Sequence, residues 1–324
     1  MNPEGLAAAY ASHFRIGAAV NPRTLMTHAE LLVRHFNSMT AENEMKWASV
    51  EPEPGRFTFE AADRLVAFAA AHEMGVRGHT LVWHNQTPRW AFDGGRPRVL
   101  AGMRSHIDAV VGRYRGRLYA WDVVNEAVAD GGSEALRRSP WLEAAGEDFI
   151  AEAFRAAHRA DPDAQLFYND YNAVLPGKRE RIFALVRDLR AAGVPVHGIG
   201  VQGHWRLETP SAEDIRAGLD LFGSLGVRLH VTELDVSVHP AGTGAAATAE
   251  AGPDLLERQA RRYGELFAIF RGYRGVLDSV TFWGIADDAT WLDHFPVRGR
   301  KDWPLLFDAA HRPKPAFEAV TRFG

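Results

Sequence analysis

The sequence predicts an α/β protein folded as a (β/α)8 TIM barrel, a single domain that spans residues 1–324. Eight short apolar runs of strand character recur along the chain, amphipathic stretches lie between them, and 324 residues suit one such barrel. The runs are Phe14–Val20, Phe36–Glu42, Val76–Trp83, Tyr119–Glu126, Leu166–Tyr171, Gly198–His204, Leu229–Val236 and Ser279–Ile285.

The segments between the strand-like runs are rich in Ala, Leu and Arg and have the apolar spacing of a helix face. They are Ala61–His72, Met103–Tyr114, Phe149–His158, Lys178–Ala192, Ala212–Phe222 and Leu255–Phe270. A doubly wound open sheet is the competing architecture. It is disfavoured because no glycine-rich dinucleotide-binding turn follows the first strand, where the chain reads Ala18-Ala19-Val20-Asn21-Pro22.

The composition excludes several classes of function. Apolar residues make up 46% and charged residues 24% of the chain, which is typical of a globular protein. A net charge of −4 provides no basic surface for nucleic acid, and no run of 18 apolar residues predicts a membrane span. Without cysteine, disulfides and thiolate chemistry are excluded. We therefore expect neither nucleic acid nor a membrane as partner.

No domain boundary is evident along the sequence. The stretch Pro240–Gly252, rich in Ala, Gly and Thr, lies between the seventh strand and its helix, and we expect it to form a mobile loop on the active face. The start, Met1–Gly5, has no basic and no apolar region of an export signal, which favours a cytoplasmic protein. The alternative is a secreted protein whose leader has been removed. Monomer and homodimer both remain open.

Two carboxylate motifs are the most informative part of the chain. Trp121–Glu126 and Val231–Asp235 each end an apolar run and place a glutamate, Glu126 or Glu233, where a strand is expected to give way to a loop. In a parallel barrel these strand ends open on one face, where catalytic groups collect. An acid and a nucleophile that flank one bond are what glycoside hydrolysis requires. The alternative for either glutamate is a salt bridge at the barrel mouth.

The other strand ends carry amides, imidazoles and indoles, although the strands themselves are apolar. The polar or aromatic ends are Thr40–Trp47, Arg77–Gln86, Tyr168–Asn172, Val201–Trp205 and Phe282–Asp287, followed by Thr290-Trp291. Folding alone gives no reason for this pattern. Amides, histidine and lysine can bind sugar hydroxyls, and tryptophan, of which the chain has nine, can stack on sugar rings. The rim therefore predicts a ligand with many hydroxyl groups.

Over essentially its whole length, the sequence resembles glycoside hydrolase family 10 endo-β-1,4-xylanases. The blocks that carry this resemblance occur in order and with their spacing intact: Thr40–Trp47, Gly78–Gln86, Trp121–Glu126, Gly200–Trp205, Thr232–Asp235 and Trp283–Trp291. One departure is Thr290, where the family usually has serine. The segment Phe295–Lys301 is similar to that of leaderless intracellular members, which implies short xylo-oligosaccharides rather than raw xylan as substrate.

The resemblance implies a role for each matching residue. Glu126 would be the acid/base of a retaining reaction, Glu233 its nucleophile, and the peptide between His79 and Thr80 would be cis. The substrate-binding positions would be Asn125, His79, Gln202 and His204 at the reacting sugar, Glu42, Asn43, Lys46, Trp83 and Gln86 on the glycone side, Trp283 and Trp291 as aromatic cover, and Tyr171 on the leaving-group side.

The residues themselves suggest how the two glutamates would differ. His204 and Asp235 are expected to form a hydrogen-bonded chain that orients Glu233 and keeps it ionised. Glu126, beside the neutral amide of Asn125, is the better candidate for the protonated carboxyl, and Asn125 is suited to bind the sugar 2-hydroxyl. Carboxyl groups about 5 Å apart would retain the anomeric configuration and a separation of about 6.5–9.5 Å would invert it.

Three alternatives complete the prediction. The histidines at the strand ends lack the His-x-x-x-His or His-Glu-x-x-His spacing of a metal site, so we expect neither a metal nor a cofactor. A barrel glycosidase acting on β-glucans or mannans should lack the block Thr40–Trp47. A sugar-binding protein without catalysis should have lost one of the four residues Glu126, Glu233, His204 and Asp235.

Overall fold

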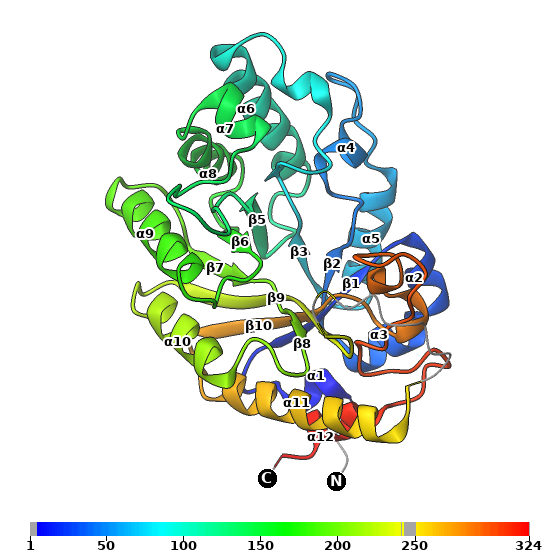
Figure 1. Ribbon diagram of the computed structural model, residues 1–324. Helices are drawn as coiled ribbons and strands as arrows, with labels where there is room; N and C mark the ends of the chain where they lie inside the picture. The colour runs from blue at the N-terminus through cyan, green and yellow to red at the C-terminus, as the bar shows by residue number, and fades with distance from the viewer. Residues whose placement is uncertain (1–4, 241, 243–250, 324) are drawn as a thin grey trace.

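Eight parallel strands close into a barrel in the computed structural model, which describes residues 5–240, 242 and 251–323 (Figure 1). Each barrel strand pairs with the next one along the chain, and the last pairs with the first, so the sheet has no free edge. The barrel strands are β1 Arg15–Val20, β2 Ser38–Ala41, β3 Gly75–Gly78, β5 Ala120–Asn125, β6 Gln165–Asp170, β7 Gly198–Val201, β9 Arg228–Ser237 and β10 Leu277–Phe282. The predicted TIM barrel is confirmed.

Two predicted strands are interrupted at the barrel mouth. Short strands β4 (Val82–Trp83) and β8 (His204–Arg206) follow β3 and β7 after gaps and pair with β5 and β9. The gaps contain His79 and Gln202, whose side chains hydrogen-bond to Asp122 and to Glu126 instead of continuing the apolar wall. The predicted runs Val76–Trp83 and Gly198–His204 are therefore each a barrel strand, a break and a two- or three-residue extension.

Helices surround the barrel (Figure 1). The α-helices are α1 Leu6–Ala9, α2 Pro22–Thr27, α3 Ala29–His35, α4 Trp47–Val50, α5 Glu60–Ala71, α6 Arg96–Arg113, α7 Pro140–Ala145, α8 Phe149–Ala160, α9 Lys178–Ala191, α10 Ala212–Gly223, α11 Pro253–Arg271 and α12 Pro315–Thr321. The 3-10 helices are η1 Arg89–Phe92, η2 Asp287–Ala289 and η3 Trp291–Asp293. All six predicted helical stretches fall on helices, although those ending at His72, Tyr114 and Ala192 each extend one residue past the helix. The short helices α2, α3 and α12 were not predicted, because six or seven residues are too few for a periodic signal.

The residues after β1 show how the local sequence determines where helix α2 begins. Asn21 accepts hydrogen bonds from the backbone N–H groups of Arg23 and Thr24, both at 3.0 Å, and Thr24 Oγ1 accepts from Asn21 N at 2.9 Å. Pro22 occupies the first helical position, where its missing N–H costs nothing. Asn21-Pro22 is therefore the start of a helix, in agreement with the exclusion of a dinucleotide-binding turn.

Large side chains fill the barrel interior below the site. Trp121 is fully buried and leaves no room beside Gly78, where an added Cβ would lie 2.1 Å from its ring. Arg77, 1% exposed, forms a two-armed ion pair with Asp122 and donates from Nε to His230 Nδ1 at 3.2 Å. These groups form a rigid floor on which the barrel mouth is built.

Two other predictions concern the rest of the chain. None of the helices within residues 5–240 and 251–323 combines the length and apolar character that crossing a bilayer requires. Most of the predicted loop Pro240–Gly252 lies outside the described residues, so its placement on the active face stays a prediction.

Candidate active site

Glu126 and Glu233 both lie at the mouth of the barrel and are 9% and 5% exposed. Glu126 directly follows the last residue of β5, as predicted. Glu233 was expected at a strand end but lies inside β9, which continues to Ser237. The strand extends because β8 adds a second partner beyond the barrel wall, pairing His204 with Asp235.

The Glu233 carboxylate is held by donors on both oxygens. Asn169 Nδ2 donates to Oε1 at 2.8 Å, and His204 Nε2 lies 2.9 Å from Oε2. Burial alone would raise the pKa of Glu233, but the hydrogen bond from His204, the nearby His79 and the bond from Asn169 together lower it to about 2. Glu233 is therefore ionised and fixed in orientation near neutral pH.

His204 connects two carboxylates. Its Nδ1 lies 2.9 Å from Asp235 Oδ2, and its Nε2 bonds Glu233. Burial lowers the pKa of His204, yet the charge of Asp235 and the bonds to both carboxylates raise it to about 10. The ring is thus an imidazolium that donates at both nitrogens, and the predicted hydrogen-bonded chain is confirmed. Trp291 Nε1 also donates to Asp235, at 2.8 Å.

Glu126 has different partners. Trp83 Nε1 donates to Oε2 at 2.8 Å, while Gln202 Nε2 and Asn125 Nδ2 donate to Oε1 at 3.0 and 3.2 Å. All three donors are neutral. The backbone of Glu126 is left-handed, with φ of 58°, an uncommon conformation for a non-glycine residue. Such backbone outliers cluster at functional sites, where the surrounding contacts enforce them.

An amide network joins the two glutamates. Thr232 Oγ1 donates to Asn169 Oδ1 at 2.6 Å, which fixes the orientation of the Asn169 amide. Its Nδ2 then donates to Glu233 and to Asn125 Oδ1, the latter at 2.8 Å. Asn169 was part of the predicted polar rim but had no assigned role. Its signal was an amide inside an otherwise apolar strand, although its partners could not be known without the barrel.

His79 lies against the charged floor of the barrel. Its Nδ1 is 2.9 Å from Asp122 Oδ2 and 4.0 Å from Glu233 Oε1, and its ring meets the Trp283 ring edge to face at 5.3 Å. The peptide between His79 and Thr80 is cis, as the resemblance implies. His79 is therefore next to the Glu233 carboxylate and covered by an aromatic ring.

The predicted glycone-side residues come together on one side of Glu126. Lys46 Nζ and Gln86 Nε2 both donate to Asn43 Oδ1, at 3.1 and 3.2 Å, and Lys46 Nζ lies 4.9 Å from the centre of the Trp83 ring. Glu42 accepts from Asn21 Nδ2 at 2.9 Å. Lys46 is only 7% exposed, and burial lowers its pKa although Glu233, Glu42 and Glu126 oppose this effect. It is a buried cation among carboxylates and not a surface charge.

Trp291 and Trp283 lie over the His204 side of the site. The Trp291 ring is 4.8 Å from the His204 ring, and Trp283 is 7% exposed. Phe295, 59% exposed, stacks on Trp291 at 5.3 Å with a 16° interplanar angle. The segment Phe295–Lys301 therefore adds an outer aromatic ring to the aromatic cover. Of its cations, Lys301 is tied to Asp293 by an ion pair.

Tyr171 is anchored in a charged cluster that the sequence did not reveal. Its hydroxyl bonds Asp130 and accepts from Arg137 Nη2 at 2.5 Å, and Lys178 Nζ lies 3.7 Å from the ring centre. Arg137 also donates from Nε to the Glu126 carbonyl at 3.0 Å. The Arg137 guanidinium also lies over this ring, 5.5 Å from its centre, so two cations contact Tyr171.

Comparison with known proteins supports the sequence resemblance. The profile of Glycosyl hydrolase family 10 matches residues 5–323. The chain is 55% identical to an endo-1,4-beta-xylanase of Geobacillus stearothermophilus and 52% identical to endo-1,4-beta-xylanase B of Paenibacillus barcinonensis, with 96% of each chain covered in both cases.

Solved structures agree with these relatives. The structure of xylanase XynB from Paenibacillus barcinonensis, complexed with a conduramine derivative, is 51% identical with a TM-score of 0.97, and 98% of each chain is covered. A mutant structure in complex with xylotriose is 41% identical, also with a TM-score of 0.97, and covers 98% of this chain and 99% of its own.

Proposed function

The chain belongs to glycosyl hydrolase family 10 and is a glycoside hydrolase, and we propose that it is an endo-1,4-β-xylanase that cleaves xylan and xylo-oligosaccharides with retention of configuration. The observation that carries the proposal is the contrast between the two glutamates. Glu233 is bonded by an imidazolium, while the hydrogen bonds to the Glu126 carboxylate from the described residues come from the neutral groups of Trp83, Gln202 and Asn125.

In the first step, the Glu233 carboxylate attacks the anomeric carbon of the sugar. The glycosidic bond breaks, and its oxygen takes the proton of Glu126 as the shortened chain departs. Glu233 suits this step because His204 and Asn169 hold it ionised and aligned, so little reorganisation is needed. The product is a covalent glycosyl-enzyme ester.

In the second step, Glu126, now a carboxylate, removes a proton from water, and the resulting hydroxide attacks the same carbon. The ester bond to Glu233 breaks and its carboxylate is restored. Asn125 supports both steps in this proposal, because its Nδ2 bonds Glu126 and its amide can reach the sugar 2-hydroxyl, a contact that strengthens in the transition state.

Substrate binding is assigned to the remaining rim. Glu42, Asn43, Lys46 and Gln86 would bind hydroxyl groups on the glycone side, and the indoles of Trp83, Trp283 and Trp291 would enclose the sugar. Tyr171, fixed by Asp130 and Arg137, would line the leaving-group side. We further propose that the enzyme works in the cytoplasm on short xylo-oligosaccharides. Phe295 supports the proposal that the substrates are short xylo-oligosaccharides, since its ring extends the aromatic cover outward beyond Trp291.

The stereochemistry of the product tests the proposed mechanism. Proton NMR during hydrolysis of xylotetraose should show the β-anomer of the new reducing end before mutarotation produces the α-anomer. Initial release of the α-anomer would remove the nucleophilic role of Glu233. Absence of hydrolysis of xylan and xylotetraose, with activity on β-glucan instead, would overturn the substrate assignment.

A further inference from the structure

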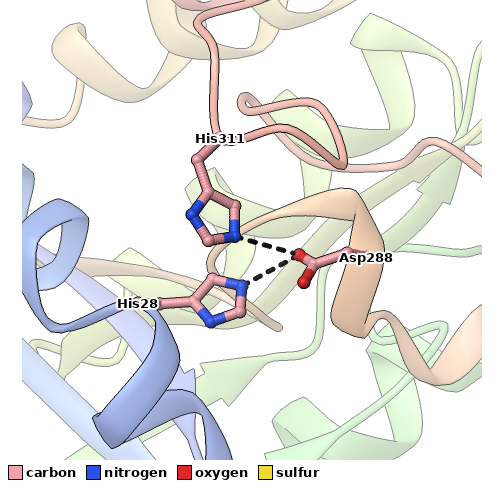
Figure 2. A group of neighbouring side chains, drawn as sticks. All are labelled: His28, Asp288 and His311. Carbon is pink, nitrogen blue, oxygen red and sulfur yellow. Dashed lines mark hydrogen bonds and ion pairs between the residues drawn. The ribbon is translucent and has the colours of Figure 1, made fainter.

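Two histidines and an aspartate from three distant parts of the chain meet outside the residues assigned to the active site (Figure 2). His28 Nε2 lies 2.8 Å and His311 Nε2 lies 3.5 Å from the same oxygen, Asp288 Oδ1. The three ligand atoms all lie within 4.8 Å of one another. His28 joins α2 to α3, Asp288 lies in η2 after β10, and His311 precedes α12.

We propose that this cluster is a binding site for a late first-row divalent cation, with Zn²⁺ as the best match. Two imidazole nitrogens and one carboxylate oxygen are a ligand set that zinc takes, with water as the fourth ligand. Ca²⁺ and Mg²⁺ prefer oxygen ligands alone. Zinc bonds of about 2.0–2.1 Å in a tetrahedron separate the ligand atoms by about 3.3 Å. The two nitrogen–oxygen distances of 2.8 and 3.5 Å bracket that value.

The hydrogen bonds of His28 direct a lone pair toward the cluster. Thr27 Oγ1 lies 3.1 Å from Arg23 O and 2.7 Å from His28 Nδ1, and when its single hydrogen goes to Arg23 O, it accepts from Nδ1–H. In a neutral ring, Nε2 then points its lone pair at Asp288 Oδ1, 2.8 Å away. Two acceptors at this distance repel each other unless a proton or a cation lies between them. A hydrogen bond that fixes the other ring nitrogen is typical of metal-binding histidines.

The backbone around each ligand is held independently of the cluster. His28 N donates to Thr24 O at 2.8 Å in the last turn of α2. Asp287, next to Asp288, is buried and bonds Lys314 Nζ at 2.8 Å. The turn that carries His311 is fixed by Asp308, whose carboxylate accepts from Ala310 N and Arg312 N, both at 2.9 Å. The ligands are therefore positioned in advance, which a metal site needs.

The cluster is also accessible. His28 is buried, whereas the side chains of Asp288 and His311 are 28% and 33% exposed. This exposure gives an ion a route of entry and leaves a place for a water ligand. A bound cation would join the connection after β1 to η2, 260 residues further along the chain, and to the turn before α12. Because unfolding separates these ligands, the ion would bind the folded protein alone and stabilise it.

The test uses the full chain, stripped of metal with EDTA and dialysed. Calorimetric titration with ZnCl2 should show one equivalent bound. Thermal unfolding should shift upward by about 5 °C when free zinc exceeds its Kd about 100-fold. MgCl2 and CaCl2 should leave the Tm unchanged. The variants His311→Ala and Asp288→Asn should each weaken zinc binding by at least about 100-fold and remove the Tm shift.

His72→Ala is the matched control, since it removes an exposed histidine at the end of α5 and should keep both zinc responses. The two ligand variants change partly exposed side chains and leave buried His28 intact, so either one suffices if the other fails to fold. No stoichiometric binding by the wild-type chain would overturn the proposal. Unchanged affinity in His311→Ala or Asp288→Asn would overturn it as well.

Discussion

His204 Nε2 lies 2.9 Å from the Glu233 carboxylate, and Nδ1 of the same ring lies 2.9 Å from Asp235. The opposite charges of His204 and Glu233 stabilise each other. The imidazolium lowers the pKa of Glu233 to about 2, and the two carboxylates raise the pKa of His204 to about 10. The burial cost of each charge is offset in part by the other, with further support from His79 and Asn169 for Glu233 and from Asp235 for His204.

The two glutamates should respond differently to removal. Glu233→Ala should abolish hydrolysis of every glycoside, because no nucleophile remains. Glu126→Ala should lower kcat/KM on xylan by about 10²–10⁴-fold, the usual contribution of a general acid, but should spare the first step with activated aryl xylosides, whose leaving groups need no proton. Pre-steady-state release of the aryl group measures that step. Equal losses by the two variants on the aryl xyloside would show that the roles are wrongly assigned.

Removal of the imidazolium should change the pH profile. In His204→Asn, Glu233 loses its strongest stabilising hydrogen bond and its pKa rises, so the acid limb of kcat/KM should move to higher pH by about one pH unit or more. Profiles of both proteins on an activated aryl xyloside measure this shift without the need for a proton donor. A purely structural role of His204 would lower activity at all pH values by the same factor and leave the limb in place.

The same residue should make stability depend on pH. The pKa of folded His204 is about 10, above the 6.5 of the unfolded chain, so its contribution is full below pH 6.5 and is lost as pH rises toward 10. The Tm difference between wild type and His204→Asn should therefore be largest at pH 6 and shrink toward pH 10. Thermal unfolding followed by circular dichroism gives both values. A difference that grows with pH would contradict the assignment of the charge.

Lys46 offers a test of the glycone side. Lys46→Met keeps the length of the buried stem but removes the cation near Trp83 and Asn43. We expect kcat/KM on xylotetraose to fall about 10- to 100-fold, the range for a charge-assisted hydrogen bond, with most of the loss in KM. Arg56→Met, which removes a cation that is 61% exposed, is the control and should behave as wild type. If the KM of Lys46→Met equals that of the wild type, Lys46 does not bind substrate and its role is purely structural.

Phe295 should affect the choice between oligomer and polymer. If the ring narrows the cleft beyond Trp291, Phe295→Ala should raise kcat/KM on soluble xylan relative to xylotetraose by about 2- to 10-fold, the range for one aromatic contact. Side-by-side kinetics on the two substrates measure the ratio. Met26→Ala, which removes another exposed apolar side chain, should leave it unchanged. An unaltered ratio in Phe295→Ala would remove the support for an oligomer preference.

Much of the site was predictable because its information is local. Apolar runs reveal strands, and the residue at which each run turns polar is the residue that reaches the barrel mouth. Glu126, Gln202 and His79 could thus be assigned to one face before any coordinates were known. Asp130 and Arg137 had no such signal, and Asn169, although it belongs to a polar strand end, gave no indication of its partners. Their importance comes from partners 34 to 64 residues away, such as Tyr171 for Arg137 and Glu233 for Asn169.

The sequence by itself determined the barrel, the face on which the side chains gather and the identity of the two glutamates, since strand and helix periods and strand-end composition are properties of short segments. Apart from the predicted chain of Glu233, His204 and Asp235, the tertiary structure decided which groups touch. The left-handed turn at Glu126 and the cation over Tyr171 appear only in the folded chain, and the convergence of His28, Asp288 and His311 follows from closure of the sheet between β10 and β1. Closure brings together residues that are far apart in the sequence. No local pattern relates such residues, because helix and strand periodicity extends only over short segments.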